Sequence, residues 1–338
     1  MRLDEVVKHF LKDAQVKNRT GNTLTIYRYS LNVLLRLLRD NCGITELECV
    51  TVLHLRECVQ LLSTPAAFDD DREGRPAYRR GRRPVSGKLS VSSIRSHVRI
   101  WKAFFRWCFQ EELMEKNVVA RLSMPKPEKR VIQAFTEEHI QKILSSIDTS
   151  TELGFRDYVI VVLLLDTGMR LSEVCSLTVD SVHDDYVKVF GKGRKEREIG
   201  IHPEVSKLIW KYIHKYRHPL DLNEKALFLA GSSDRGKPLQ VGGVKQAIER
   251  IKEVTGIEDV RFSAHTFRHT FAKMYLENGG ELFKLSRELG HSDIDVTKVY
   301  LEDFGSTEAR RDHTTFSPLS RVQLKKAKGR KRSREQNG

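Results

Sequence analysis

A short stretch with two prolines, Pro125-Lys-Pro-Glu-Lys-Arg130, most constrains how this chain can fold. Proline lacks a backbone N–H donor and breaks helices, and the charged residues around it resist burial, so the stretch is predicted to be an exposed linker. We place this linker at residues 125–135. The chain has 338 residues, whereas a typical domain has roughly 150. The sequence therefore predicts two domains of ordinary size, one on either side of the linker.

The part of the chain before the linker is predicted to be mostly helical. Apolar residues recur at helical spacing over Leu3–Leu11, and Thr23 is predicted to cap a second helix that runs to Leu38. A third helix is expected over Val52–Leu62. Between residues 63 and 88, prolines and glycines interrupt the helical pattern, which indicates a surface loop or an insertion.

A strongly amphipathic helix is expected over Ser92–Glu112. Its apolar face carries Ile94, Val98, Trp101, Phe104, Phe105 and Phe109. Four basic residues of the same helix could face phosphates, and these are Arg95, Arg99, Lys102 and Arg106. A basic helix face is more often only solvated, so both interpretations stay open for this helix.

The part of the chain after the linker is predicted to combine helices with one β-hairpin. Helical patterns resume at Thr136, where the two glutamates that follow suit the positive end of a helix dipole. The run Tyr158–Leu165 is apolar throughout and is expected to be buried. Apolar and polar residues alternate over Tyr186–Phe190 and again over Glu196–Ile201, on either side of a Gly-Lys-Gly turn. The predicted fold class is therefore mainly α with a small β-hairpin (α+β).

The distribution of charge favours a polyanionic partner. The formal net charge is +14, and the last 18 residues, Arg321–Gly338, contain eight basic residues and one acidic residue. A second cluster, Arg72–Lys88, has seven basic residues and one acidic residue. Such local excess favours binding to nucleic acid, because association releases condensed counterions. A solubilising tail would explain such a charge run equally well if it were the only feature.

Membrane insertion, disulfide bonding and metal binding are not expected. The longest apolar run, Val159–Leu165, is far shorter than the roughly 20 residues that a spanning helix needs. The charged N-terminus has no apolar signal-peptide core. The five cysteines include no CxxC pair, so reduced thiols in a cytoplasmic protein without a metal site are predicted.

Four short stretches after the linker carry residues that suit the exchange of a phosphodiester bond. In chain order these residues are Arg170, Lys192, His265, Arg268, His291 and Tyr300. Each residue type is common at a surface or in a core. Together the six supply an oxygen nucleophile, a proton acceptor, a proton donor and cations for the phosphate, so we interpret them as one site.

The chemistry explains why these residue types belong together. Negative charge gathers on the non-bridging oxygens in the transition state, and the guanidiniums of Arg170 and Arg268 could stabilise it with paired hydrogen bonds. Lys192 could protonate the leaving 5′ oxygen. A free tyrosine has a pKa of roughly 10, so Tyr300 needs a proton acceptor, and His265 is suitable. Because a phenol can form a phosphotyrosyl bond without a metal or a nucleotide, no cofactor is expected.

With these motifs the chain resembles the tyrosine recombinases, also called phage-type integrases. The resemblance rests on four stretches, which are Thr167-Gly-Met-Arg-Leu-Ser-Glu173, Gly191-Lys-Gly-Arg-Lys195, His265-Thr-Phe-Arg-His269 and Leu289-Gly-His291-Ser-Asp with Tyr300 nine residues after the histidine. It continues more loosely into the N-terminal helices, where Asn22–Arg28 is typical of the SAM-like core-binding domain of that family.

The resemblance implies a domain organisation and a role for each motif residue. It implies a SAM-like core-binding domain at 1–124 with an insertion at 63–88, a catalytic domain at 136–304, a segment at 305–320 that docks on a neighbouring protomer, and a basic tail at 321–338. It also implies that Arg170 and Arg268 are the catalytic arginines and that Glu173 steadies Arg170. Lys192 would be the hairpin lysine, and His265 would pair with Arg268. His291 would contact the phosphate, and Tyr300 would be the nucleophile. Arg194 and Lys195 of the hairpin are expected to contact DNA, and Lys195 is the rival of Lys192 as general acid.

The activity implied by the resemblance is site-specific recombination of double-stranded DNA. A homo-tetramer on two DNA sites would exchange strands through a 3′-phosphotyrosyl intermediate and a Holliday junction. The task would be movement of a transposon or phage, or resolution of a replicon, and an accessory directionality factor is a further candidate partner. Two other functions stay open: a non-catalytic DNA-binding protein, and a monomeric enzyme like the type IB topoisomerases. The expected location is the cytoplasm, on nucleoid DNA.

Overall fold

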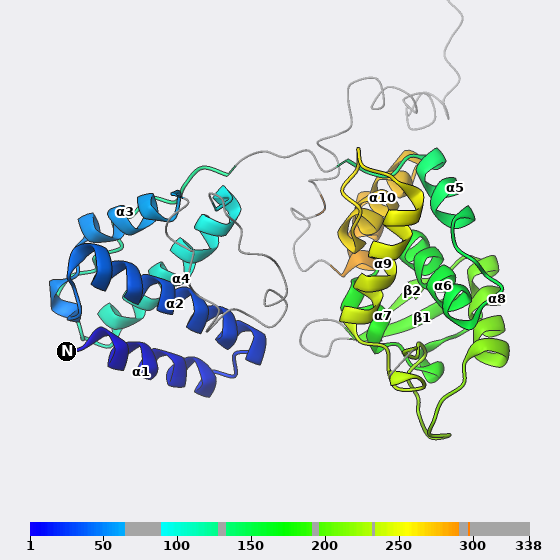
Figure 1. The fold of residues 1–338 in the computed structure, drawn as a ribbon, viewed down its shortest axis with the longest axis horizontal. Helices are drawn as coiled ribbons and strands as arrows, with labels where there is room; N and C mark the ends of the chain where they lie inside the picture. Colours follow the sequence, from blue (N-terminus) through cyan, green and yellow to red (C-terminus); the bar gives the residue numbers. More distant parts are fainter. Residues whose placement is uncertain (65–88, 128–132, 191–195, 232–233, 291–296, 298–338) are drawn as a thin grey trace, which may run out of the picture. The chain divides into compact units, whose positions relative to one another are not determined.

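The computed structural model describes residues 1–64, 89–127, 133–190, 196–231, 234–290 and 297. The chain divides into two compact units, Met1–Arg130 and Val131–Gly338 (Figure 1). Each unit has its own hydrophobic core. None of the helices in the described ranges is long and apolar enough to cross a bilayer.

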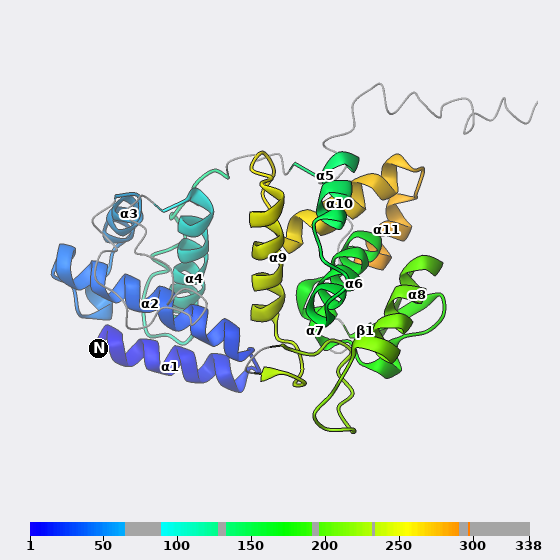
Figure 2. The same ribbon diagram turned by 45° about the vertical axis from the view of Figure 1, so that its right-hand side comes forward.

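The described part of the first unit is built from helices around a core of aliphatic and aromatic side chains. The helices are α1 (Leu3–Val16), α2 (Gly21–Cys42), α3 (Val52–Leu61) and α4 (Val91–Gln110), with a 3-10 turn, η1 (Leu47–Cys49), before α3. Helices α1 and α2 lie side by side in both views (Figures 1 and 2). Trp101, Phe104 and Phe105 of α4 are fully buried. The indole N–H of Trp101 donates to the backbone carbonyl of Ser30 at 3.1 Å, which fixes α4 against α2.

The helices predicted for this unit are confirmed, with two corrections. Thr20, and not Thr23, caps α2, because the helix begins at Gly21 and the Thr20 hydroxyl accepts the backbone N–H of Thr23 at 3.3 Å. Phe109, which we placed on the apolar face of α4, is 41% exposed, since the helix ends one residue later. The insertion predicted at 63–88 lies, from residue 65 onward, outside the described residues.

The described part of the second unit combines helices with one two-stranded antiparallel sheet. The elements are α5 (Glu137–Ser145), α6 (Glu152–Thr167), α7 (Leu171–Ser176), η4 (Val179–Ser181), β1 (Tyr186–Phe190), β2 (Glu196–Gly200), α8 (Pro203–Lys211), a π-helical turn η5 (Tyr212–Tyr216), α9 (Val241–Thr255), α10 (Ala264–Glu277) and α11 (Leu282–Leu289). Helix α6 packs against α5, α8 and α10. The run Tyr158–Leu165, which we expected to be buried, is buried at Val159 to Val161, Leu163 and Leu164. It is only partly buried at Tyr158, Val162 and Leu165. Figure 2 shows α6 between α7 and α8.

The main predictions for this unit are confirmed. The fold is mainly α with a small hairpin, in which Tyr186 pairs with Gly200 and Phe190 pairs with Glu196. Thr136 caps α5, since its hydroxyl accepts the backbone N–H of His139 at 3.2 Å. Phe135, which we placed in the linker, is buried in the core, and its N–H donates to the Thr270 hydroxyl at 2.9 Å. The compact fold of this unit therefore includes Phe135.

Candidate functional site

The turn between α6 and α7 places Arg170. Gly168 ends α6 with a φ of +58°, in the left-handed region that favours glycine. A Cβ at Gly168 would lie 2.5 Å from the ring of Phe271 and 2.9 Å from Leu289, so a larger residue would push α10 and α11 away. Arg170 then begins α7 as its N-cap residue, and its backbone N–H donates to the Glu173 carboxylate at 2.8 Å.

A buried carboxylate lies at the centre of the site. The Glu173 side chain is 5% exposed and accepts hydrogen bonds from two guanidiniums. Arg170 Nη1 donates to Oε1 at 3.0 Å, while Arg197 donates from Nη1 to Oε1 at 3.0 Å and from Nη2 to Oε2 at 2.9 Å. Burial opposes ionisation of Glu173, but the bonds from Arg197 and from the Arg170 amide outweigh it and hold its pKa below the usual value.

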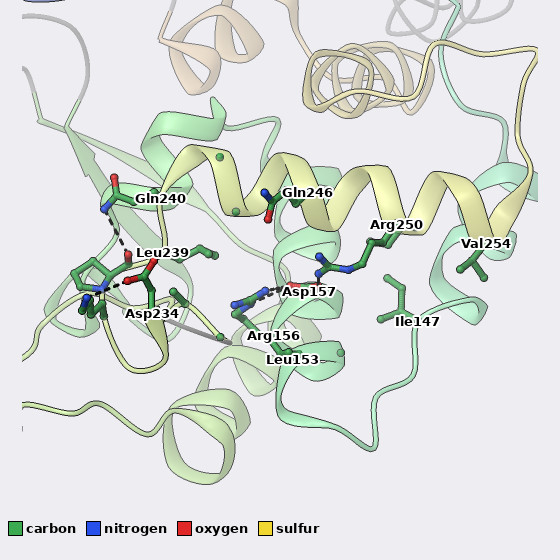
Figure 3. Close-up of a pocket in the computed structure, with 18 of the residues that line it drawn as sticks. Ile147, Leu153, Arg156, Asp157, Asp234, Leu239, Gln240, Gln246, Arg250 and Val254 are labelled. Atoms are coloured by element: carbon green, nitrogen blue, oxygen red, sulfur yellow. Dashed lines mark hydrogen bonds and ion pairs between the residues drawn. The ribbon is translucent and has the colours of Figure 1, made fainter. Parts of the chain in front are cut away.

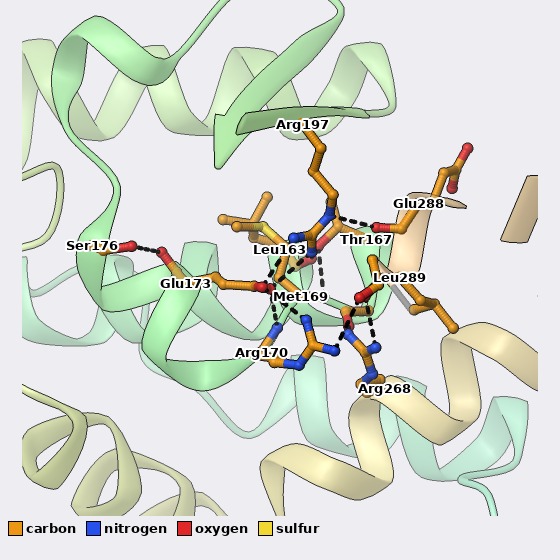
Figure 4. A network of polar contacts seen from close by, with 12 residues as sticks. Leu163, Thr167, Met169, Arg170, Glu173, Ser176, Arg197, Arg268, Glu288 and Leu289 are labelled. Carbon is orange, nitrogen blue, oxygen red and sulfur yellow. Dashed lines mark hydrogen bonds and ion pairs between the residues drawn. The ribbon is translucent and has the colours of Figure 1, made fainter. Parts of the chain in front are cut away.

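Arg268 and Arg170 come together at the end of α11. Arg268 is buried on α10, where Nη1 donates to the Gly168 carbonyl and Nη2 to the Leu289 carbonyl, both at 2.8 Å. Arg170 Nη2 donates to the next carbonyl, that of Gly290, at 3.3 Å. The two guanidiniums therefore bind consecutive peptide oxygens (Figure 4). The Arg170 side chain remains 43% exposed, so an anion from solvent can reach it.

His265 lies beside these arginines, in the first turn of α10. Partial burial lowers its pKa below the usual value, and the positive charges of Arg268, Arg261 and Arg170 lower it further. His265 as a whole residue is nevertheless exposed to solvent. His265 is therefore an accessible, neutral base at neutral pH, next to two guanidiniums.

Arg197 is a residue of this cluster that our sequence analysis missed. It lies on β2, where Ile199, two residues further on, is buried. Because alternate residues of a strand share a face, the same alternation that predicts an inward Ile199 also predicts an inward arginine. A charged residue on the buried face of a hairpin was the signal available in the sequence.

Several predicted site residues lie outside the described residues. These are Lys192, Arg194, Lys195, His291 and Tyr300, together with the segments 305–320 and 321–338. In the described residues the structure thus brings together Arg170, Glu173, His265 and Arg268 from the predicted set.

The four basic residues predicted to bind DNA on α4 fall into two pairs. Arg95 donates to the carbonyl of Pro125, and Lys102 donates to the carbonyl of Leu122 at 2.5 Å. These two side chains therefore tie α4 to the segment that follows it. Arg99 and Arg106 are exposed.

An open cavity of about 860 Å³ lies elsewhere in the second unit, between α6 and α9 (Figure 3). Its floor holds a buried ion pair, in which Arg156 donates from Nε and Nη2 to the Asp157 carboxylate at 2.9 and 2.6 Å and from Nη1 to the Leu229 carbonyl at 2.7 Å. Arg250 Nη2 donates to the second Asp157 oxygen at 2.9 Å. Among the predicted site residues that the structure describes, none lines this cavity. The described residues contain no cluster of three or more potential metal ligands.

The chain is similar to known proteins over most of its length. Residues 133–305 match the phage integrase family. The tyrosine recombinase XerD of Staphylococcus haemolyticus is 27% identical over 319 residues, which cover 94% of this chain and 99% of that protein. The tyrosine recombinase XerC of Bacillus subtilis is 31% identical over 244 residues, which cover 70% of this chain and 76% of XerC.

Two solved structures share the fold. The lambda integrase in a tetramer bound to a Holliday junction has a TM-score of 0.64 at 18% identity, covering 87% of this chain and 78% of that chain. The Tn1549 transposon integrase in complex with circular intermediate DNA has a TM-score of 0.64 at 21% identity, covering 92% of this chain and 98% of that chain.

Proposed function

Because the chain belongs to the phage integrase family and is a tyrosine recombinase, a site-specific DNA recombinase, we propose that Tyr300 is the nucleophile that cuts and rejoins its DNA. One observation carries the proposal for the site. Arg170 and Arg268, which lie far apart in the sequence, bind consecutive carbonyls at the end of α11, with His265 beside them. Two adjacent guanidiniums and a neutral imidazole suit a phosphodiester attacked by a phenol.

The proposed reaction conserves the phosphodiester. The Tyr300 oxygen bonds to the scissile phosphorus while its proton passes to His265, and the bond from phosphorus to the 5′ oxygen breaks. Lys192 protonates that oxygen, and the two guanidiniums hold the charge that develops on the non-bridging oxygens. The free 5′ hydroxyl then attacks the phosphotyrosyl bond of a partner strand. Because one phosphoester replaces another, rejoining needs no nucleotide hydrolysis.

We propose double-stranded DNA as the partner, held by a tetramer on two synapsed sites. Two rounds of strand exchange would then pass through a Holliday junction. Two proteins that share the fold support this proposal: the lambda integrase is bound as a tetramer to a Holliday junction, and the Tn1549 transposon integrase is in complex with circular intermediate DNA. The biological substrate is either the ends of a mobile element or a replicon resolution site, with or without a directionality factor.

The test is covalent capture of DNA. The purified chain is incubated with a library of nicked duplexes, and the protein–DNA adducts are isolated under denaturing conditions and sequenced. We expect adducts through residue 300, and the recovered sequences identify the target site. The Tyr300→Phe variant should bind the same duplexes without forming adducts. Site-independent binding without adducts in the wild type would favour a non-catalytic protein, whereas site-independent relaxation of supercoils by a monomer would favour a topoisomerase-like enzyme.

A further inference from the structure

The C-terminal end of α11 is held by three arginines from three different elements. Carbonyls in the last turn of a helix lack partners within the helix. Here the carbonyls of Glu288, Leu289 and Gly290 accept from Arg197 Nε at 3.0 Å, Arg268 Nη2 at 2.8 Å and Arg170 Nη2 at 3.3 Å, respectively. Positive charge also suits this end of the helix dipole. Figure 4 shows the three guanidiniums around this helix end.

Arg197 differs from Arg170 in where its nitrogens are directed. Both Nη atoms bind the Glu173 carboxylate, and Nε binds the Glu288 carbonyl, so every nitrogen of its guanidinium is engaged within the protein. Its side chain is only 15% exposed, compared with 43% for Arg170. Arg197 is therefore placed to hold other protein groups, whereas Arg170 is placed to meet solvent and substrate.

Gly290 supplies a second, independent observation. It ends α11 with a φ of +64°, and a Cβ at this position would lie 2.8 Å from both Cζ and Nη1 of Arg197. The Arg197 guanidinium thus fills the space directly beside the end of α11. Any movement of Arg197 changes its packing against Gly290, whose carbonyl binds Arg170.

We propose that Arg197 is a positioning residue for strand cleavage: it clamps Glu173 to the last turn of α11 and so fixes the Arg170 guanidinium against the scissile phosphate. The inference rests on the proposed function of this site. Glu173 holds Arg170 through both its backbone N–H and its Nη1, so the orientation of the carboxylate decides that of the guanidinium. Lysine cannot replace Arg197, because one ammonium cannot form two parallel bonds to a carboxylate and a third to a carbonyl.

The test compares Arg197→Lys with Arg156→Lys as a matched control. Arg156 is buried in the same unit and likewise binds a carboxylate and a backbone carbonyl, but it lies at the separate cavity between α6 and α9. Each variant is assayed for thermal unfolding, for DNA affinity and for the rate of covalent capture. Two substrates are used, a duplex with the natural scissile phosphodiester and a duplex with a neutral methylphosphonate at that position.

We expect Arg197→Lys to capture the natural duplex about 100-fold more slowly than the wild type, since small misplacements of a catalytic group can cost that much. DNA affinity and unfolding temperature should match those of Arg156→Lys. The defect should be smaller on the methylphosphonate duplex, because a methylphosphonate linkage carries no negative charge for a well-placed guanidinium to stabilise. A purely structural role would slow both substrates equally.

The inference is overturned if Arg197→Lys captures the natural duplex as fast as Arg156→Lys, or if its defect is the same on both substrates. If Arg197→Lys does not fold, Gly290→Ala carries the same comparison, since its Cβ would lie 2.8 Å from the Arg197 guanidinium and would displace it. Failure of the wild type to capture any duplex would instead contradict the proposed function.

Discussion

The cluster around Glu173 shows how a buried carboxylate can remain charged. Removing a carboxylate from water is costly unless hydrogen bonds and opposite charge replace the solvent. At Glu173 the Arg170 backbone amide and two guanidiniums do so, which is why its pKa stays low despite burial. Glu173 and its arginines therefore form a prearranged, charged frame into which a phosphate can bind without reorganisation.

The shifted pKa of His265 predicts how cleavage depends on pH. Partial burial and three arginines lower the pKa below the ordinary value of 6.5, so the imidazole is neutral and able to accept a proton at pH 7. The capture rate should be level near pH 7 and fall as the pH drops through the lowered pKa. The folded protein also binds this proton more weakly than the unfolded chain does, so protonation of His265 should destabilise the fold below pH 6.5.

The matched variant for this prediction is His265→Gln. It should lower the capture rate by roughly 100- to 10,000-fold, the usual contribution of a general base, and should lose the acidic limb of the pH–rate profile. Quenched time courses of adduct formation between pH 5 and 8 measure both the rate and its pH dependence. An unchanged acidic limb in the variant would show that another group accepts the proton of Tyr300.

The general acid can be assigned by changing the leaving group. A 5′ thiol has a pKa of roughly 8.5, far below that of an alcohol, so it leaves without protonation. On a duplex with a 5′-bridging sulfur, Lys192→Ala should recover a rate close to that of the wild type, after a loss of roughly 100-fold or more on the natural duplex. Lys195→Ala should show the same modest defect on both duplexes, which reflects its contact with DNA. Recovery by Lys195→Ala alone would transfer the acid role to Lys195.

At the scale of elements, the sequence predicts where helices and strands lie better than it predicts their ends. The apolar periodicity of α4 and the alternation of β1 and β2 are confirmed because packing follows those periods. Our prediction placed the N-cap of α2 three residues too late. Thr20 and Thr23 are equally suitable cap residues by type, and only the backbone conformation, which becomes helical at Gly21, decides between them. Lys102 shows the same limit, because a basic side chain on a helix can bind a carbonyl 20 residues away as well as a phosphate.

The insertion at residues 63–88 leads to a testable prediction about DNA binding. We expect its cluster of basic residues, Arg72–Lys88, to bind DNA beside the core site. Replacing residues 65–88 with a short Gly-Ser linker should weaken DNA binding and flatten the dependence of affinity on salt, by roughly 0.9 in slope for each phosphate that the shortened chain no longer neutralises. Fluorescence anisotropy between 50 and 200 mM salt measures the slope.

A matched control replaces only Asp69, Asp70 and Asp71 of the same insertion with asparagine. This change keeps the length of the segment and removes negative charge, so it should leave the slope intact or steepen it. A deletion that binds like the wild type at every salt concentration would show that the insertion does not meet DNA.

At the scale of the whole molecule, local motifs identify the groups of the site but not their arrangement. Family, fold class and recombinase activity were predictable, because Arg170, His265, Arg268 and Tyr300 occur in short recognisable stretches. The hydrogen bonds that align them join distant residues, such as Arg170 with Gly290 across 120 positions. The inward position of Arg197 could be predicted from the alternation of β2, but its role could not, because its partners Glu173 and Glu288 become its neighbours only after folding.

The predicted docking of residues 305–320 can be tested through strand exchange, which requires more than one protomer. If residues 305–320 dock on a neighbouring protomer, a chain that ends at Phe304 keeps Tyr300 and the arginine cluster but loses its link to the next protomer. It should still form covalent adducts on one duplex, whereas strand exchange between two duplexes should be abolished.

The basic tail must be separated from this effect, because its positive charge alone contributes to DNA affinity. A chain that ends at Ser320 removes only the tail, and it should bind DNA more weakly at high salt yet still exchange strands. Gel assays of adducts and of recombinant product for the two truncations measure both steps, and full recombination by the shorter chain would contradict the docking role.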